Sequence, residues 1–211
     1  MLATTKPQAG NVGAKPFLIT GLPRSRTAWL SVFMSGAGSI CYHEPIGGIR
    51  EVSDIEAIYK SDYYKFVGIA DSGLGFFLDW ILKNIQPRTL IVERDPAEVI
   101  ESLARLGLPR TNFTELLSDR LQPFKEHPLV MWVPYEALNM KRVMQKIYWH
   151  LMPGQPFDEE RYELLAKMHI ETDVEETLVQ ARKNKKNLDF LLRDIIPLVK
   201  TKENPNARNL H

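Results

Sequence analysis

Residues 17–33 read FLITGLPRSRTAWLSVF, and this stretch determines the fold that we predict. It begins with a short apolar run of strand length and continues through a turn that contains Gly21 and Pro23. It ends in a helix-forming stretch from Thr27 to about Ser35. Strand, tight turn and helix in this order open a β-α-β unit. We therefore expect a parallel sheet whose first strand lies at residues 17–20.

The same alternation continues along the chain. Apolar, β-branched or aromatic runs predict further strands at 39–42, 64–70, 89–92 and 130–133. Apolar residues at helical spacing predict helices at 51–60, 74–85, 96–106, 136–151, 158–169 and 172–198. The sequence therefore predicts an α/β fold with a central parallel sheet flanked by helices and a helical C-terminal third.

The composition fits one globular domain with polar ends. Of the 211 residues, 44% are hydrophobic and 25% are charged, which is enough apolar material for a sizeable core. We expect a flexible N-terminal tail at 1–15, a single domain at 16–200 and a polar C-terminal tail at 201–211.

Charge and cysteine content argue against several classes of protein. Lys+Arg 27 against Asp+Glu 26 gives a net charge of +1, unlike a general nucleic-acid binder or a protein held on anionic membranes. Cys41 is the only cysteine, which excludes an intramolecular disulfide and argues against a zinc site. No apolar run approaches the ~18–20 residues that cross a bilayer, and the polar N-terminus lacks a secretory signal. We expect a cytoplasmic protein with no metal, nucleic-acid or membrane partner.

The turn at residues 21–30 has the features of an anion site. A loop between a strand and a helix points backbone N–H groups and the positive end of the helix at one place. Arg24 to Thr27 add two guanidinium groups and two hydroxyls, which suit phosphate or sulfate oxygens. An ordinary turn with surface arginines is the alternative. The phosphate-binding pattern G-x-x-x-x-G-K-[ST] is not met, because RTA (26–28) stands where it requires Gly, Lys and Ser/Thr.

A second motif, ERDPAEVIESL (93–103), closes the fourth predicted strand and opens the next helix. Asp95 is a candidate N-cap and Pro96 the first helical residue. Arg94 stands at the same edge of the predicted sheet as the first loop, and Ser102 follows two helical turns later. Arg94 and Ser102 could therefore hold one bound group between them. The alternative is a capped helix in which Arg94 pairs with Asp95.

Together the two motifs resemble those of the sulfotransferase family, enzymes that use 3′-phosphoadenosine 5′-phosphosulfate (PAPS). The family's first signature, Pro-(Lys/Arg)-Ser-Gly-(Thr/Ser)-(Thr/Ser)-Trp, stands here as PRSRTAW (23–29). Its second, Arg-(Asp/Asn)-Pro with a serine eight residues after the arginine, matches RDP (94–96) and Ser102. YEAL (135–138) is similar to the Tyr-Glu-x-Leu that often follows the fifth strand. The likeness covers roughly residues 17–140 and implies a P-loop NTPase-like topology.

The resemblance implies a metal-independent sulfuryl transfer and assigns its donor site. Arg24 takes the position of the family's catalytic basic residue, which stabilises charge on the transferring group. The loop supplies backbone amides, the Thr27 hydroxyl and an indole near the adenine, and Arg94 and Ser102 bind the 3′-phosphate. The donor-binding residues that we expect are Arg24, Ser25, Arg26, Thr27, Ala28, Trp29, Arg94 and Ser102.

Three positions differ from the family pattern. Arg26 replaces the loop glycine, and two outcomes are open. An arginine can adopt a helical φ, donate its N–H and bind the donor with its charge, or it can narrow the pocket and abolish transfer. Ala28 lacks the hydroxyl common there, and GIADS (68–72) has no lysine where many members carry one. Two alternatives to a transferase are therefore kept. One is a P-loop phosphotransferase acting on a nucleotide or another small molecule, and the other is a non-catalytic nucleotide-binding protein of the same fold.

An acceptor hydroxyl needs a base, and YHEP (42–45) offers the best candidates. The segment ends the second predicted strand, at the sheet edge where open α/β folds place their ligands. A family branch acting on carbohydrates and small molecules has a glutamate near this point. Glu44 is therefore our first choice for the base and His43 the second, with a water-exposed turn as the alternative. The sequence thus predicts transfer from PAPS to a small hydroxylated acceptor such as a carbohydrate.

Overall fold

The computed structural model of the chain describes residues 13–36, 38–108 and 111–168. Within these ranges the centre is one five-stranded sheet in the order β2-β3-β1-β4-β5, and every neighbouring pair is parallel. This confirms the predicted α/β fold with a central parallel sheet. The strands are β1 (Lys15–Gly21), β2 (Ser39–His43), β3 (Phe66–Ala70), β4 (Arg88–Glu93) and β5 (Val130–Pro134).

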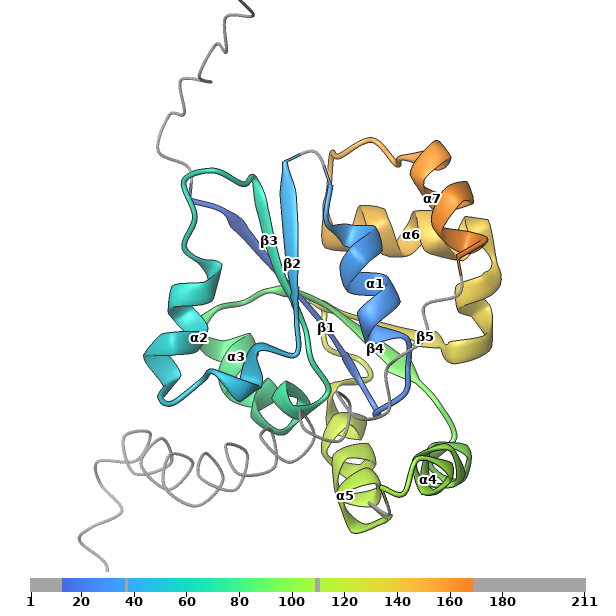
Figure 1. Cartoon of the computed structure of the whole chain (residues 1–211). Coiled ribbons are helices and arrows are strands. Elements are labelled where there is room, and N and C mark those ends of the chain that lie inside the picture. Colours follow the sequence, from blue (N-terminus) through green and yellow to red (C-terminus); the bar gives the residue numbers. More distant parts are fainter. Residues whose placement is uncertain (1–12, 37, 109–110, 169–211) are drawn as a thin grey trace, which may run out of the picture.

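Helices cover both faces of the sheet, because parallel strands need crossover connections (Figure 1). One side carries α1 (Thr27–Met34), α6 (Lys141–Leu151) and α7 (Glu159–Ala166). The other side carries α2 (Val52–Tyr59) and α3 (Leu78–Asn84). After β4 come α4 (Pro96–Arg105) and α5 (Thr111–Leu121). The described residues also form the 3₁₀ helices η1 (Pro45–Gly47), η2 (Gly73–Phe77), η3 (Gln122–Phe124) and η4 (Tyr135–Asn139).

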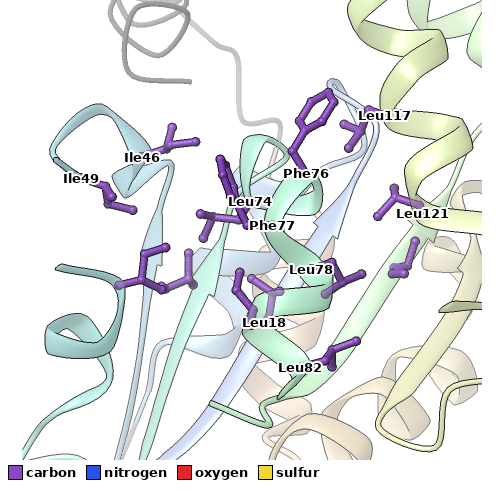
Figure 2. Close-up of a cluster of buried hydrophobic side chains, with 14 of the residues drawn as sticks. Leu18, Ile46, Ile49, Leu74, Phe76, Phe77, Leu78, Leu82, Leu117 and Leu121 are labelled. Atoms are coloured by element: carbon purple, nitrogen blue, oxygen red, sulfur yellow. The ribbon is translucent and has the colours of Figure 1, made fainter. Parts of the chain in front are cut away.

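Two hydrophobic clusters, one on each face of the sheet, stabilise this arrangement. Leu18 of β1 belongs to the cluster beneath α2, α3 and α5 (Figure 2), whereas Phe17 and Ile19 belong to the cluster beneath α1, α6 and α7. This alternation follows from the two-residue period of a strand. In β3, a Cβ atom at Gly68 would overlap the Phe17 ring, so glycine lets that ring lie directly on the sheet.

The structure corrects the predicted elements at three places. Residues 111–121 form α5, which we did not predict because TNFTELLSDRL is mostly polar. The helix predicted at 136–151 is η4 followed by α6, because Met140 between them has an extended backbone. The helix predicted at 74–85 begins as η2 and continues as α3.

Several predicted segments lie partly or wholly outside the described residues. The helix predicted at 172–198, the tail at 201–211 and residues 1–12 of the N-terminal tail are outside them. β1 begins at Lys15, the last residue of that predicted tail. In the described part of the chain, no helix is both long and apolar enough to cross a membrane.

Candidate active site

The candidate site lies at the edge of the sheet where the parallel strands end. The registers place Gly21 of β1 beside Val92 of β4, and His43 of β2 beside Ala70 of β3. The segments that follow these four strands therefore leave the sheet at about the same level. In open α/β folds this edge is where ligands bind.

The loop between β1 and α1 has the backbone geometry of an anion site. Arg24 and Arg26 have positive φ values of 65° and 59°, whereas φ of Ser25 between them is negative. Such alternation turns successive N–H groups toward one concavity. The N–H groups of residues 24–29 have no acceptor in the described part of the chain, and no side chain caps the N-terminus of α1. An anion is the ligand that satisfies such a group of donors.

The backbone of Arg26 does not have the helical φ that was one of the two possibilities for this residue. Its φ of 59° and ψ of 25° are left-handed, a region that costs a non-glycine residue about 1–2 kcal/mol. The turn into α1 has a left-handed residue at this position, although the side chain is an arginine. The family's glycine adopts such a conformation without strain, and this chain adopts it with an arginine.

Arg94 joins the two sequence motifs into one site. Its Nη1 donates to the backbone carbonyl of Arg24 at 2.5 Å, and its Nε lies 3.6 Å from the Glu98 carboxylate. Asp95 instead accepts from the N–H of Ala97 at 2.8 Å and caps α4. The alternative pairing of Arg94 with Asp95 is therefore not what the structure has.

Two residues of η4, which we did not predict, hold the arginines of the site. Arg26 Nη1 donates to Asn139 Oδ1 at 2.6 Å. The guanidinium groups of Arg26 and Arg94 lie 5.3 and 4.3 Å from the centre of the Tyr135 ring, which is a cation–π arrangement. The signal that could have found Tyr135 is YEAL (135–138), which we had compared with the family without assigning a role.

The charge at this part of the site is unbalanced. The Arg24 guanidinium makes no hydrogen bond or ion pair with another described residue, and Arg26 has only neutral partners. Glu98, whose side chain is 56% exposed, is the carboxylate that pairs with Arg94. Glu93 and Asp95 also lie beside Arg94, but Glu93 pairs with Lys125 and Asp95 caps α4. The guanidinium groups of Arg24 and Arg26 therefore have no carboxylate partner among the described residues, and such cations attract anions.

Hydroxyl groups of the loop line the same place. Ser25 is fully buried, and its Oγ has no hydrogen-bond partner within the described structure. Thr27 is also buried, and its Oγ1 lies 3.4 Å from His43 Nε2. Buried hydroxyls without a partner are uncommon, so the Ser25 hydroxyl is a further group that a bound oxygen could satisfy.

His43 and Glu44 form a pair next to this loop. His43 Nε2 lies 3.8 Å from Glu44 Oε1, and each side chain is about one-third exposed, at 36% and 35%. Burial lowers the pKa of His43, and the Glu44 charge opposes that shift. The imidazole is therefore mainly neutral at pH 7 and able to accept a proton. Its contact with Thr27 distinguishes the pair from a turn that faces only water.

Among the described residues, the structure shows no hydrogen bond between the remaining predicted donor residues and the arginines. Trp29 Nε1 donates to the Leu165 carbonyl at 3.0 Å, and the indole stacks on Phe33 at 5.3 Å between ring centres. The indole thus packs between α1 and α7. Ser102 lies partly buried on α4, with no recorded hydrogen bond to Arg94, and Ala28 is partly buried in the first turn of α1.

A cavity of about 270 Å³ borders Arg94 on the side of α5. Leu22 and Ile91 contribute apolar lining, and Trp132, Ser118 and Gln122 contribute polar groups. Because Arg94 also contacts the β1–α1 loop, the cavity adjoins the cationic part of the site. Sequence reasoning missed this cavity, because Ser118 and Gln122 belong to the polar segment that we left without an interpretation.

Neither metal ligation nor thiol chemistry is indicated at this edge. Within the described ranges, no three or more His, Cys, Asp or Glu residues are grouped so that they could hold a metal ion. Cys41 is 6% exposed, and burial raises the pKa of its thiol, which keeps the thiol protonated and inert.

Comparison with known proteins bears on the fold. No protein-family model matches the sequence, and no curated protein matches it. Among solved structures, the crystal structure of mouse sulfotransferase SULT7A1 complexed with PAP aligns with a TM-score of 0.51 and 14% sequence identity. The alignment covers 90% of this chain and 88% of that chain. The chain accordingly has the sulfotransferase fold, an α/β fold with P-loop-like topology.

Proposed function

We propose that the protein is a sulfotransferase that moves a sulfuryl group from PAPS to a hydroxyl of a small acceptor, with carbohydrates as one candidate class. The observation that carries the proposal is the 2.5 Å hydrogen bond from Arg94 Nη1 to the Arg24 carbonyl. It joins the loop suited to a 5′-phosphosulfate to the arginine suited to a 3′-phosphate. One nucleotide with both groups is the ligand that spans them.

The residues present fit such a donor. The free N–H groups at 24–29 and the unpartnered Ser25 hydroxyl would bind the 5′-phosphosulfate. The Arg24 guanidinium, which has no partner among the described residues, would stabilise the charge that develops on the transferring group. Arg94 and Ser102 would bind the 3′-phosphate, and Arg26 would add a second guanidinium near it. PAPS supplies the sulfur electrophile and a phosphate leaving group.

Of the two candidate bases, the geometry favours His43. Its Nε2 lies next to Thr27 in the donor loop, whereas Glu44 reaches the loop only through this imidazole. In the transfer, Nε2 takes the proton of the acceptor hydroxyl as the acceptor oxygen bonds to sulfur. The bond from sulfur to the 5′-phosphate oxygen breaks, and its electron pair leaves with 3′-phosphoadenosine 5′-phosphate (PAP). Glu44, 3.8 Å from Nε2, stabilises the imidazolium that forms.

Calorimetric titration with PAP, beside ATP·Mg²⁺, tests the donor site. We expect saturable PAP binding and much weaker ATP·Mg²⁺ binding, because the loop has no lysine for terminal phosphates and ATP has no 3′-phosphate. The variant Arg105→Ala should bind PAP as wild type does. It is the matched control for loss of the Arg94 guanidinium, because Arg105 lies on the helix that follows Arg94 and pairs there with the exposed Glu101. Equal affinity for the two nucleotides would contradict the proposal and favour a P-loop phosphotransferase.

A second function, nucleotide binding without transfer, rests on the contacts of Arg26. Asn139 and Tyr135 hold this side chain over the β1–α1 loop, at a position where the family pattern has no side chain. Incubation with radiolabelled PAPS and a panel of monosaccharides, phenols and aliphatic alcohols separates the two functions. Label in any acceptor supports the transferase. PAP binding with no labelled product in wild type and with activity restored in Arg26→Gly would support the binding protein.

A further inference from the structure

A buried carboxylate lies at the end of β3, beside the proposed base pair but outside the proposed reaction. Asp71 is 1% exposed. Its Oδ2 accepts from the N–H of Ile46 at 3.1 Å, and its Oδ1 accepts from the N–H groups of Gly73 at 2.7 Å and Leu74 at 3.3 Å. One carboxylate thus binds backbone donors of two separate turns.

Those donors are the first N–H groups of two 3₁₀ helices. Ile46 lies in η1, which follows β2, and Gly73 and Leu74 lie in η2, which follows β3. Glu44 and Ser72, at the N-cap positions, make no side-chain capping hydrogen bond. Asp71 therefore caps both helices at once, although it belongs to neither and lies 25 residues after Ile46 of η1 in the sequence.

The turn that Asp71 caps contains the strained residue Glu44. Glu44 has φ 46° and ψ 48°, left-handed values that are strained for a residue with a Cβ atom. Two hydrogen bonds fix the backbone around Glu44. The N–H of Glu44 donates to the carbonyl of Ala70 in β3 at 3.0 Å, and the N–H of Ile46 donates to Asp71, the residue after β3. Such a conformation persists only where the surroundings determine it.

Close packing of the two turns makes the arrangement rigid. A Cβ atom at Gly73 would lie 2.7 Å from Ile46 Cδ1 and 3.2 Å from Asp71 Oδ1, so a larger residue there would make the end of the Ile46 side chain and the Asp71 carboxylate shift. Ile46 is 1% exposed and belongs, with Leu74, to the cluster beneath α2 and α3 (Figure 2). Movement of η1 would therefore disturb both the hydrophobic cluster and the capping hydrogen bonds.

We propose that Asp71 is a positioning residue for the His43–Glu44 pair. By capping η1 and η2 together it holds Glu44 in its left-handed conformation, with the carboxylate 3.8 Å from His43 Nε2. The effect of Asp71 on catalysis rests on the proposed function. Its effect on the position of Glu44 relative to His43 does not depend on that function. An asparagine at 71 cannot accept from both turns, because its amide offers one acceptor atom where the aspartate side chain has two oxygens.

A double-mutant cycle on the His43 titration tests the coupling without any enzyme assay. NMR spectroscopy follows the His43 ring in wild type, Glu44→Gln, Asp71→Asn and the double variant. In the wild-type background we expect Glu44→Gln to lower the midpoint by about 0.5–1 pH unit, as a lost carboxylate near 4 Å implies. In the Asp71→Asn background the same substitution should lower it by less than half as much, because Glu44 is no longer held beside the ring.

The variant Asp158→Asn is the matched control, because Asp158 also caps a helix by accepting a backbone N–H, from Arg161 at 2.9 Å, but on α7. It should leave the full Glu44→Gln effect. Equal effects of Glu44→Gln in the wild-type and Asp71→Asn backgrounds would overturn the proposal. If Asp71→Asn does not fold, amide hydrogen exchange of native protein at pH 8 decides. Exchange of the Ile46 N–H as fast as in an unstructured peptide would then contradict the proposed capping.

Catalysis gives a separate readout. In Asp71→Asn we expect kcat for sulfuryl transfer to fall about 10-fold or more, with KM for PAPS unchanged, because donor contacts come from other loops. Wild type without transfer to any acceptor would contradict the proposed function and leave the result of the titration cycle valid. A lost coupling with an unchanged kcat would show that Asp71 does not act on the reaction.

Discussion

The two halves of the sheet edge differ in charge and in how their charges are held. Around β1, β4 and η4 lie three guanidinium groups. Those of Arg94 and Arg26 are held by a carbonyl, an amide and an aromatic ring, whereas that of Arg24 has no partner among the described residues. After β2 and β3 lie two carboxylates and one imidazole, and the Asp71 carboxylate is fully buried. In the proposed reaction the cationic half would bind the anionic donor, and the acidic half would accept the proton of the acceptor. A transfer reaction needs both, side by side, and Thr27 with His43 forms the boundary between them.

The largest effect expected at this boundary is on the rate. His43→Gln should lower kcat for sulfuryl transfer by ~10²–10⁴-fold while PAP affinity stays nearly constant, as loss of a general base implies. Glu44→Gln should cost less, because it removes only the charge that stabilises the imidazolium. Steady-state kinetics with radiolabelled PAPS measures both. His150→Gln is the control, since that ring contacts the Thr89 carbonyl instead. A larger loss in Glu44→Gln than in His43→Gln would return the role of base to Glu44.

The acidic half also predicts a dependence of stability on pH. Burial is the main cause that raises the pKa of Asp71 to about 7, and the Glu44 charge adds to it. Between about pH 4 and pH 7 the unfolded chain loses the Asp71 proton while the folded chain keeps it. The free energy of unfolding should therefore fall by up to about 4 kcal/mol as pH rises through this range.

Urea denaturation at intervals from pH 4 to pH 8, in wild type and Asp71→Asn, isolates this contribution. The free energy of unfolding of Asp71→Asn should decline much less between pH 4 and pH 7 than that of wild type, even if the variant is less stable at every pH. The lowered pKa of His43 acts with the opposite sign, because it makes the folded protein bind protons less tightly than the unfolded chain. Because Asp71→Asn should also change the pKa of His43, the His43 midpoint measured by NMR in each protein is used to subtract that contribution from its slope. Identical slopes in both proteins would show that Asp71 is ionised throughout the range.

In the cationic half, the third expected effect is on affinity. Arg94→Ala should weaken PAP binding by ~1.5–3 kcal/mol, or about 10–150-fold in Kd, the range for a charge-assisted hydrogen bond. The loss should be much smaller for adenosine 5′-monophosphate, which has no 3′-phosphate. Calorimetry with both nucleotides measures the difference. An equal loss for both would mean that Arg94 only supports the Arg24 carbonyl.

How far the sequence predicts this site depends on the kind of contact. The strands and the two loop motifs follow from local patterns, and parallel topology then brings Arg94 and the β1–α1 loop to one edge. The contacts of Arg26 with Tyr135 and Asn139 join residues 113 positions apart at the farthest and have no local signal. The double capping by Asp71 depends on how two turns pack, which strand periodicity does not contain. The Trp29 indole packs against α7, whose placement no local pattern near residue 29 specifies.

The smallest expected effect separates the side chain of Arg26 from its backbone. Arg26→Ala and Arg26→Gly both lose the contacts with Asn139 and Tyr135, but only glycine adopts φ 59° without strain. Glycine also gains more conformational freedom in the unfolded chain, which offsets part of the relief. We therefore expect Arg26→Gly to exceed Arg26→Ala by about 0.5–1 kcal/mol in free energy of unfolding, measured by urea denaturation. A less stable glycine variant would mean that the loop does not keep its left-handed turn, and the convergence of N–H groups on which anion binding depends would then be absent.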